Sequence, residues 1–161
     1  MDKEELRRRI VTLLREQSIL TLAVADDCGV PWAAPLFYAA DGFDIFFVSD
    51  PGSRHGRAIA RSPAVAAAVH APDPDWRQIR GLQIEGEASK IADGDLADRA
   101  LRRYVERFPF TDIFFRRAEV LGPEIAERVS AARFHLLRPA RIVLVDNSVA
   151  FGFHAELAVE K

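Results

Sequence analysis

The stretch SILTLAVADDCGVPWAAPLFYAADGFDIFFVS, residues 18–49, decides the fold class of this chain. It holds three runs rich in apolar, β-branched and aromatic residues, which is the composition of β-strands. A turn of Asp-Cys-Gly separates the first two runs, and Asp-Gly, a strong hairpin signal, separates the last two. The runs therefore predict an antiparallel meander of three strands, at 18–26, 30–40 and 43–49.

The segments on either side extend this meander. Apolar residues at helical spacing predict a helix from Lys3 to Gln17 before it, with one stripe packed on the sheet. Three further strand-like regions follow, and the last of them divides into two strands around Asp146-Asn147. The resulting six to seven antiparallel strands favour a barrel, because closure removes exposed strand edges. We expect these later strands at 64–70, 79–91, 132–146 and 148–159.

Two more helices are expected between these strands. Ser53 is a good N-cap for a short helix that Pro63 ends, and the run 93–109 has a continuous apolar face at helical spacing. Short helical pieces are expected after it. We therefore predict one domain over residues 1–161, with an N-terminal helix and a helical insertion at about 94–130.

Bulk composition narrows the function classes. Hydrophobic residues make up 49% and charged residues 29% of the chain, and the net charge is −2, which gives no support for nucleic-acid or membrane binding. The single cysteine excludes an internal disulfide framework. Because the N-terminus resembles neither a signal peptide nor a membrane span, we expect a cytoplasmic protein.

The most informative motif is the strand-to-helix junction Ser53-Arg54-His55. A helix N-terminus presents unpaired N–H groups and a partial positive charge, so it attracts phosphate. The serine hydroxyl, the arginine fork and the imidazole can add further bonds. From spacing alone, a plain N-cap followed by solvated arginines is an equally good interpretation.

Other catalytic or metal-binding arrangements are not evident. The four histidines show no paired ligand spacing, so no metal site is predicted. Neither Ser49 nor Ser53 has a recognisable histidine and acid partner in the sequence.

The order of motifs resembles the pyridoxamine 5′-phosphate oxidase-like FMN-binding split barrels. The frame runs from Pro31 through Pro35-Leu36-Phe37-Tyr38, a glycine turn and an aromatic strand to Ser53-Arg54-His55-Gly56 and Ser62-Pro63. In the second half, RGLQIEG at 80–86, RRYVERFPF at 102–110 and DNSVAFG at 146–152 resemble the YhbP-like uncharacterised bacterial branch.

The resemblance implies a homodimeric split β-barrel with FMN sites at the interface. Carried over residue by residue, the second strand runs beside the flavin ring, Val48 and Ser49 lie under the ribityl chain, and Ser53, Arg54 and His55 meet the phosphate. Gln83 is the polar group nearest the ring, and the partner supplies Trp76, Phe151 and Phe153. The second-strand residues concerned are Ala34, Pro35, Leu36 and Phe37.

The same resemblance limits the reaction. Authentic oxidases carry an arginine and a lysine where this chain has Ala34 and Ala39, and an Arg-Gln pair where it has Arg80-Gly81. We therefore expect an FMN-dependent oxidoreductase of unknown small-molecule substrate rather than a pyridoxamine phosphate oxidase. The alternatives are a non-catalytic flavin- or haem-binding protein and a barrel that has lost its cofactor.

Overall fold

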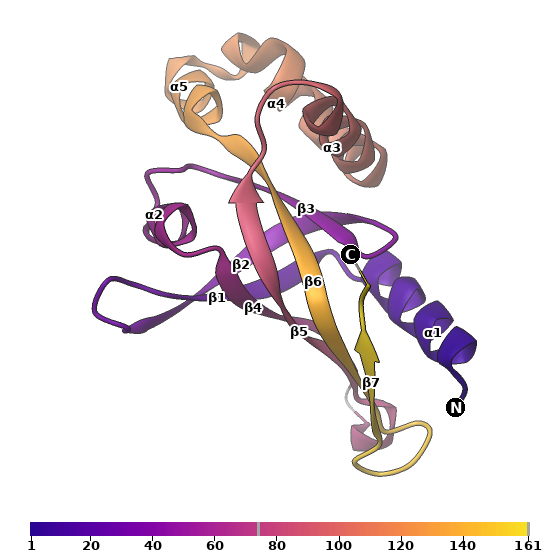
Figure 1. Cartoon of the computed structure of the whole chain (residues 1–161). Coiled ribbons are helices and arrows are strands. Elements are labelled where there is room, and N and C mark those ends of the chain that lie inside the picture. The colour runs from indigo at the N-terminus through magenta and orange to yellow at the C-terminus, as the bar shows by residue number, and fades with distance from the viewer. Residues whose placement is uncertain (74, 161) are drawn as a thin grey trace.

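Six antiparallel strands close into a barrel, and a seventh strand extends it at one side (Figure 1). The strands follow one another in the order β3-β2-β1-β4-β5-β6, and a pairing between β3 and β6 completes the circle. This computed structural model describes residues 1–73 and 75–160. The predicted split β-barrel with added helices is thus confirmed.

The strands are β1 (Ile19–Ala25), β2 (Pro31–Asp41), β3 (Asp44–Ser49), β4 (Ala64–Ala71), β5 (Arg80–Lys90), β6 (Arg133–Asp146) and β7 (His154–Ala158). The helices are α1 (Lys3–Glu16), α2 (Arg54–Arg61), α3 (Asp95–Arg107), α4 (Asp112–Arg117) and α5 (Pro123–Ala131). Short 3-10 turns are η1 (Trp76–Gln78), η2 (Pro109–Thr111) and η3 (Ala118–Leu121). None of the helices in this part of the chain is both long and apolar enough to cross a bilayer.

Strand β6 pairs with β5 along one edge and with two strands, one after the other, along its other edge. Its first half pairs with β3, with Leu137 opposite Ile45, and its second half pairs with β7. Between the halves the register against β5 shifts at Gly86, which faces Pro139. Since proline has no N–H to donate, a bulge is the natural solution there. Gly86 is one of two glycines in β5, and a glycine within a strand often marks such a bulge.

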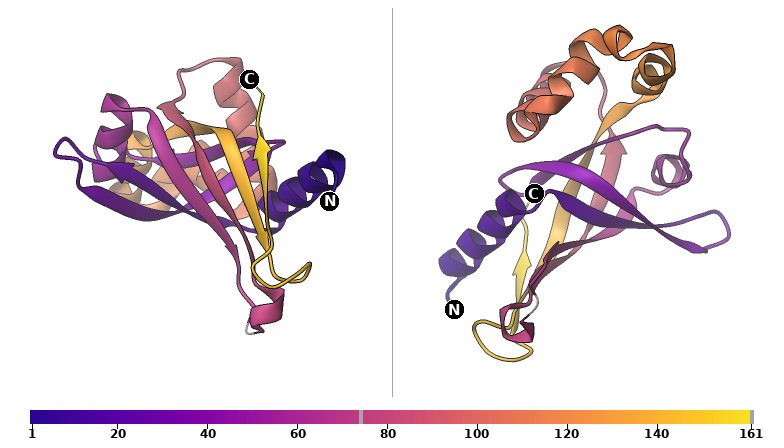
Figure 2. Two further views of the ribbon diagram at one scale, coloured as in Figure 1. Left: turned by 60° about the horizontal axis from the view of Figure 1, so that its bottom comes forward. Right: turned by 180° about the vertical axis from the view of Figure 1, so that it is seen from behind.

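The barrel core is apolar and is covered by α1. The helix lies against the barrel (Figure 2) and presents a buried stripe to its core, in which Ile10 is completely buried. Side chains alternate along each strand, so that β1 turns Leu20 and Leu22 inward. Tyr38 is also fully buried, and its hydroxyl has no hydrogen-bond partner among the described residues. Burial raises the pKa of this phenol, so it stays protonated.

Helix α3 packs on the outside of β2 and β3. Its Arg99 donates to Asp41 at 2.8 Å and lies 3.0 Å from Asp44, which fixes the helix to the β2–β3 turn. Farther along, Tyr104 and Phe108 cover Ala39 of β2. The short helices α4 and α5 follow beyond this contact, away from α1 (Figure 2).

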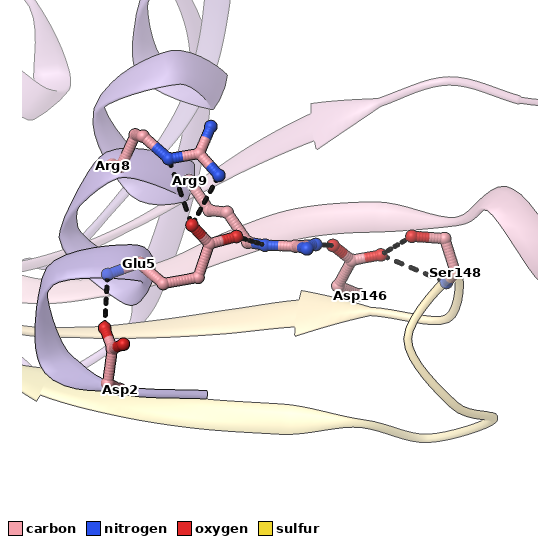
Figure 3. A network of polar contacts seen from close by, with 6 residues as sticks. All are labelled: Asp2, Glu5, Arg8, Arg9, Asp146 and Ser148. Carbon is pink, nitrogen blue, oxygen red and sulfur yellow. Dashed lines mark hydrogen bonds and ion pairs between the residues drawn. The ribbon is translucent and has the colours of Figure 1, made fainter.

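A polar network joins α1 to the end of β6 (Figure 3). Asp146, only 3% exposed, accepts hydrogen bonds from Arg9 at 3.0 Å and from the Ser148 hydroxyl at 2.5 Å. Arg9 also donates to Glu5 at 2.6 Å, and Glu5 in turn pairs with Arg8. The first turns of α1 are therefore held to the β6–β7 loop by charge-assisted bonds.

Replacing Asp146 by alanine is expected to lower the free energy of unfolding by about 1–3 kcal/mol, because its donors lose a buried acceptor. Urea denaturation measures the change. Lys3→Ala is the control, since its ion pair with Glu160 joins two exposed side chains and should contribute less than about 1 kcal/mol. Equal, small losses in both variants would show that the network does not hold α1.

The last strand is shorter than predicted. A strand was expected from 148, but β7 begins at His154, and 147–153 form a loop. Side chains take over the backbone partners there: the Asp146 carboxylate accepts from the Ser148 N–H, and the Asn147 side-chain oxygen accepts from the Gly152 N–H. Gly152 adopts a φ of 72°, which a strand does not accommodate.

Candidate functional site

The junction between β3 and α2 is shaped by short side chains that bond to the backbone. The Asp50 carboxylate accepts from the Gly52 N–H at 2.7 Å, and its carbonyl accepts from the Ser53 N–H. Ser53 caps α2, as predicted, and accepts from the Gly56 N–H at 3.0 Å. The N–H groups of the first turn, at Arg54 and His55, have no acceptor within the helix. The junction therefore offers donors and a positive helix end to an anion.

The packing of α2 on the preceding turn requires a glycine at position 56. A Cβ there would lie 2.5 Å from the Asp50 carbonyl oxygen and 2.7 Å from that of Pro51. Only a glycine lets α2 pack this closely on the turn that precedes it. The close approach serves the shape of the junction.

Three polar side chains meet beside the free helix end. The Ser49 hydroxyl lies 2.6 Å from His55 Nε2 and 3.3 Å from the Ser53 hydroxyl. Sequence alone did not associate Ser49 with a histidine, because the two belong to different elements. In the described part of the chain no carboxylate bonds to the His55 ring, so this is a serine–histidine pair and not a triad.

A second imidazole near this cluster could not be found from the sequence. His135 of β6 lies opposite Phe47 of β3, and their rings stack at 5.1 Å with an interplanar angle of 11°. Its Nδ1 lies 3.0 Å from the Arg133 carbonyl oxygen, and the residue is 1% exposed. Only the closing pair of strands brings it here, and no local pattern signals that pairing.

Acid is expected to destabilise the protein through these two imidazoles. Burial lowers the pKa of His55 and of His135 from the ordinary 6.5, so the folded chain resists their protonation. Above pH 6.5 both imidazoles are neutral in the folded and the unfolded chain, and their contribution to the free energy of unfolding is complete. As the pH falls from there through the lowered pKa values, the unfolded chain binds more protons than the folded chain, and this contribution is lost. Urea denaturation between about pH 7.5 and 5 measures this. The variant His135→Gln should lose less stability over that interval than the parent, and an unchanged slope would contradict the assignment.

Arg54 points toward the β1–β2 hairpin. One of its guanidinium nitrogens lies 3.1 Å from a carboxylate oxygen of Asp26, and its Cζ lies 4.4 Å above the ring of Trp32. The side chain is 40% exposed. The residue predicted to meet a phosphate therefore already has an anionic and an aromatic neighbour.

The β2 residues predicted to border a ring alternate between two sides of the barrel wall. Ala34 is buried and Leu36 partly buried, whereas Pro35 and Phe37 are exposed. Small residues lie side by side on the exposed face of β2, β1 and β4, followed by polar side chains of β5, and we call this the alanine-rich face. One row is Ala33, Ala23, Ala66 and Glu85, and the next is Pro35, Thr21, Ala68 and Gln83.

Two other residues predicted to line the site, Gln83 and Val48, lie in different surroundings. Gln83 is exposed and stands in the same row as Pro35, three strands away, or roughly 14 Å at ordinary strand spacing. Val48 is partly buried and packs with Tyr104 and Phe108 under α3. Gln83 therefore lies on the alanine-rich face, whereas Val48 packs into the aromatic cluster under α3.

The aromatic residues expected from a partner subunit lie far from the junction within one chain. Trp76 is 52% exposed and meets Phe151 edge to face at 5.3 Å, and Phe151 is 81% exposed. Their segments lie at the end of the barrel opposite α2 (Figure 1). Strand β4 runs between the two ends and spans roughly 25 Å with its eight residues. Phe153, partly buried, ends the same loop.

The two alanines that replace charged residues of authentic oxidases are buried. Ala34 is 8% exposed, and Ala39 is 2% exposed beneath Tyr104 and Phe108. The side chain at position 39 is thus part of the contact between β2 and α3. Among residues 1–73 and 75–160, no group of three His, Cys, Asp or Glu side chains is arranged to hold a metal ion.

Comparison with known proteins agrees with this architecture. The family model of pyridoxamine 5′-phosphate oxidase matches residues 6–138. A UPF0306 protein of Klebsiella pneumoniae (strain 342) is 31% identical over 141 residues, which cover 86% of this chain and 84% of that protein.

Solved structures share the fold at low identity. A haem-binding protein from Mycobacterium smegmatis matches 98% of this chain with a TM-score of 0.75 at 20% identity, and the match spans 58% of that protein. An FAD-binding protein from Mesorhizobium loti matches 84% of this chain and 88% of its own, with a TM-score of 0.62 at 16% identity. These likenesses concern the fold alone, but the family match covers most of the chain. The chain therefore belongs to the pyridoxamine 5′-phosphate oxidase-like split-barrel family, together with the UPF0306 proteins.

Proposed function

We propose that this protein binds FMN, with the phosphate at the start of α2. The observation that carries the proposal is the cluster of Ser49, Ser53 and His55 beside the free helix end, in a chain of this family. Two hydroxyls, an imidazole and unpaired N–H groups are the donors that a phosphate requires. The donor set of the junction thus fits the group.

The alanine-rich face of the barrel supports a place for the flavin ring. Pro35 of β2 lies beside Thr21 of β1 and Ala68 of β4, and Ala33 lies beside Ala23 and Ala66, so a planar ring can lie against small side chains there, next to the exposed ring of Phe37. Main-chain groups of 34–37 then border it. Gln83, on the same face, is the polar side chain that can bond to the ring edge.

A homodimer would complete the site. Much of the alanine-rich face is exposed in the described part of the chain, and the exposed pair Trp76 and Phe151 lies at the far end of the same barrel. A two-fold axis across this face brings the aromatic pair of one copy toward the junction of the other. Two equivalent sites at the interface follow from that arrangement.

Bound FMN would supply hydride or single-electron transfer, while the protein orients the ring and excludes water. Because Ala34 and Ala39 are buried and uncharged, no second phosphate site for a pyridoxal-type substrate is proposed. We therefore propose an oxidoreductase acting on a different small molecule.

Titration with FMN tests the proposal. Flavin fluorescence is expected to change on binding, and riboflavin, which lacks the phosphate, should bind at least about tenfold more weakly if one charge-assisted phosphate bond is lost. Equal affinities for the two ligands would remove the phosphate from the junction, and no binding of either would overturn the proposal.

Haem is the second candidate because an exposed imidazole lies on the alanine-rich face. His70 follows Ala66 and Ala68 on the outward side of β4 and is available as an axial ligand. A shift of the Soret band of added haem away from that of free haem, lost in His70→Ala, would favour haem over flavin.

A further inference from the structure

The contact between Arg54 and the β1–β2 hairpin bears on how strongly the proposed site binds its ligand. Arg54 is the strongest phosphate-binding side chain at the junction, because guanidinium forks match phosphate oxygens. In this structure a carboxylate oxygen of Asp26 lies 3.1 Å from that guanidinium. A carboxylate and a phosphate compete for the same N–H donors.

The Asp26 carboxylate is held in place by its own hairpin. Its other oxygen accepts hydrogen bonds from the Val30 N–H at 2.9 Å and from the Cys28 N–H at 3.0 Å. Trp32, at the start of β2, lies under the guanidinium and fixes its plane. The hairpin therefore presents a preorganised anion to Arg54 and not a freely rotating one.

The pair is weak enough to be displaced. Both side chains are partly exposed, 40% for Arg54 and 31% for Asp26, and ion pairs at such sites contribute little to stability. A phosphate carries nearly twice the charge of a carboxylate and several acceptor oxygens. It can take the guanidinium, but it must separate the pair or share its donors with Asp26, and it then lies near that negative charge.

A second ion pair, at the other end of α2, provides the comparison. Arg61, on the same helix, pairs with Asp27 of the same hairpin, and both pairs line one hollow of about 430 Å³ between α2 and the hairpin. Asp27 is the more exposed of the two aspartates, and its partner stands at the far end of α2 from the junction. Removing either carboxylate changes the net charge by the same amount.

We propose that Asp26 is a built-in competitor for Arg54, so that the β1–β2 hairpin sets the affinity of the junction for a phosphate-bearing ligand. This inference rests on the proposed phosphate position. The direction of the effect on affinity separates two roles for Asp26. A residue that only positions Arg54 would strengthen binding of the ligand, whereas a competitor weakens it.

The test compares Asp26→Asn with Asp27→Asn in the full chain, by titration with FMN and with riboflavin. Asn keeps the size of the side chain and its ability to accept from the hairpin N–H groups. We expect Asp26→Asn to bind FMN about three- to tenfold more tightly than the parent, with riboflavin affinity unchanged. Asp27→Asn should change FMN affinity less than twofold.

Each other outcome decides between the two proposals. Unchanged or weaker FMN binding by Asp26→Asn overturns the competition, while a preference of the parent for FMN over riboflavin still upholds the phosphate site. An equal gain in both aspartate variants reduces the effect to net charge and also overturns it. If no protein in the series binds FMN, both proposals fail.

Discussion

Replacing Arg54 by alanine is expected to weaken FMN binding about 10- to 100-fold. A charge-assisted bond to an ionised partner contributes about 1.5–3 kcal/mol, and each 1.4 kcal/mol is a factor of ten in affinity. The change also leaves the Asp26 carboxylate without its partner, close to the phosphate position. Isothermal titration or flavin fluorescence measures the loss.

Two controls make this result specific. Riboflavin affinity should be the same in Arg54→Ala and the parent, because the lost bond is to the phosphate. Arg61→Ala removes an equal charge from the same helix but pairs with Asp27 at its far end, so its effect should stay within about threefold. An Arg54→Ala protein that binds FMN as well as the parent would exclude Arg54 from the site.

Gly86→Ala is expected to destabilise the barrel by about 2–4 kcal/mol. A Cβ at this position would lie inside the contact distance of the Arg138 carbonyl oxygen and 2.9 Å from the Pro139 Cα, both of them backbone atoms. The bulge between β5 and β6 would have to open and lose ladder hydrogen bonds. Chemical denaturation monitored by circular dichroism gives the free energy of unfolding.

Gly52→Ala is the matched control for this change. Its Cβ would meet only the Asp50 carboxylate, at 3.2 Å, and that exposed side chain needs to shift by only a few tenths of an ångström. We expect a change below about 1 kcal/mol for this variant. A comparably small change in Gly86→Ala would mean that the bulge adapts to a side chain.

Local patterns were enough to predict most of the elements. The apolar stripe of α1, the Asp-Gly turn and the Ser53 cap are each encoded within a few residues, and the structure confirms all three. The predicted strand from residue 148 was wrong, because side chains there take the place of backbone hydrogen-bond partners. Asp146 and Asn147 bond to Ser148 and Gly152, and so the apolar run after them forms a loop.

The candidate site was only partly predictable for a different reason. Ser53, Arg54 and His55 are consecutive, so their common position at a helix start follows from sequence. The contacts that define their surroundings join distant segments: His135 reaches the junction through the β3–β6 pairing, and Asp26 through the hairpin. Such neighbours depend on strand register, which a single sequence does not specify.

The double use of β6 has a consequence for folding. The barrel closes only when Leu137 meets Ile45, and the residues between them include two strands and all the later helices. Contacts between such distant residues form slowly, since the loop entropy is lost before they stabilise the chain. During synthesis, β3 would leave the ribosome long before β6 and keep an unpaired edge meanwhile. Truncation before residue 133 should therefore yield a chain prone to aggregation.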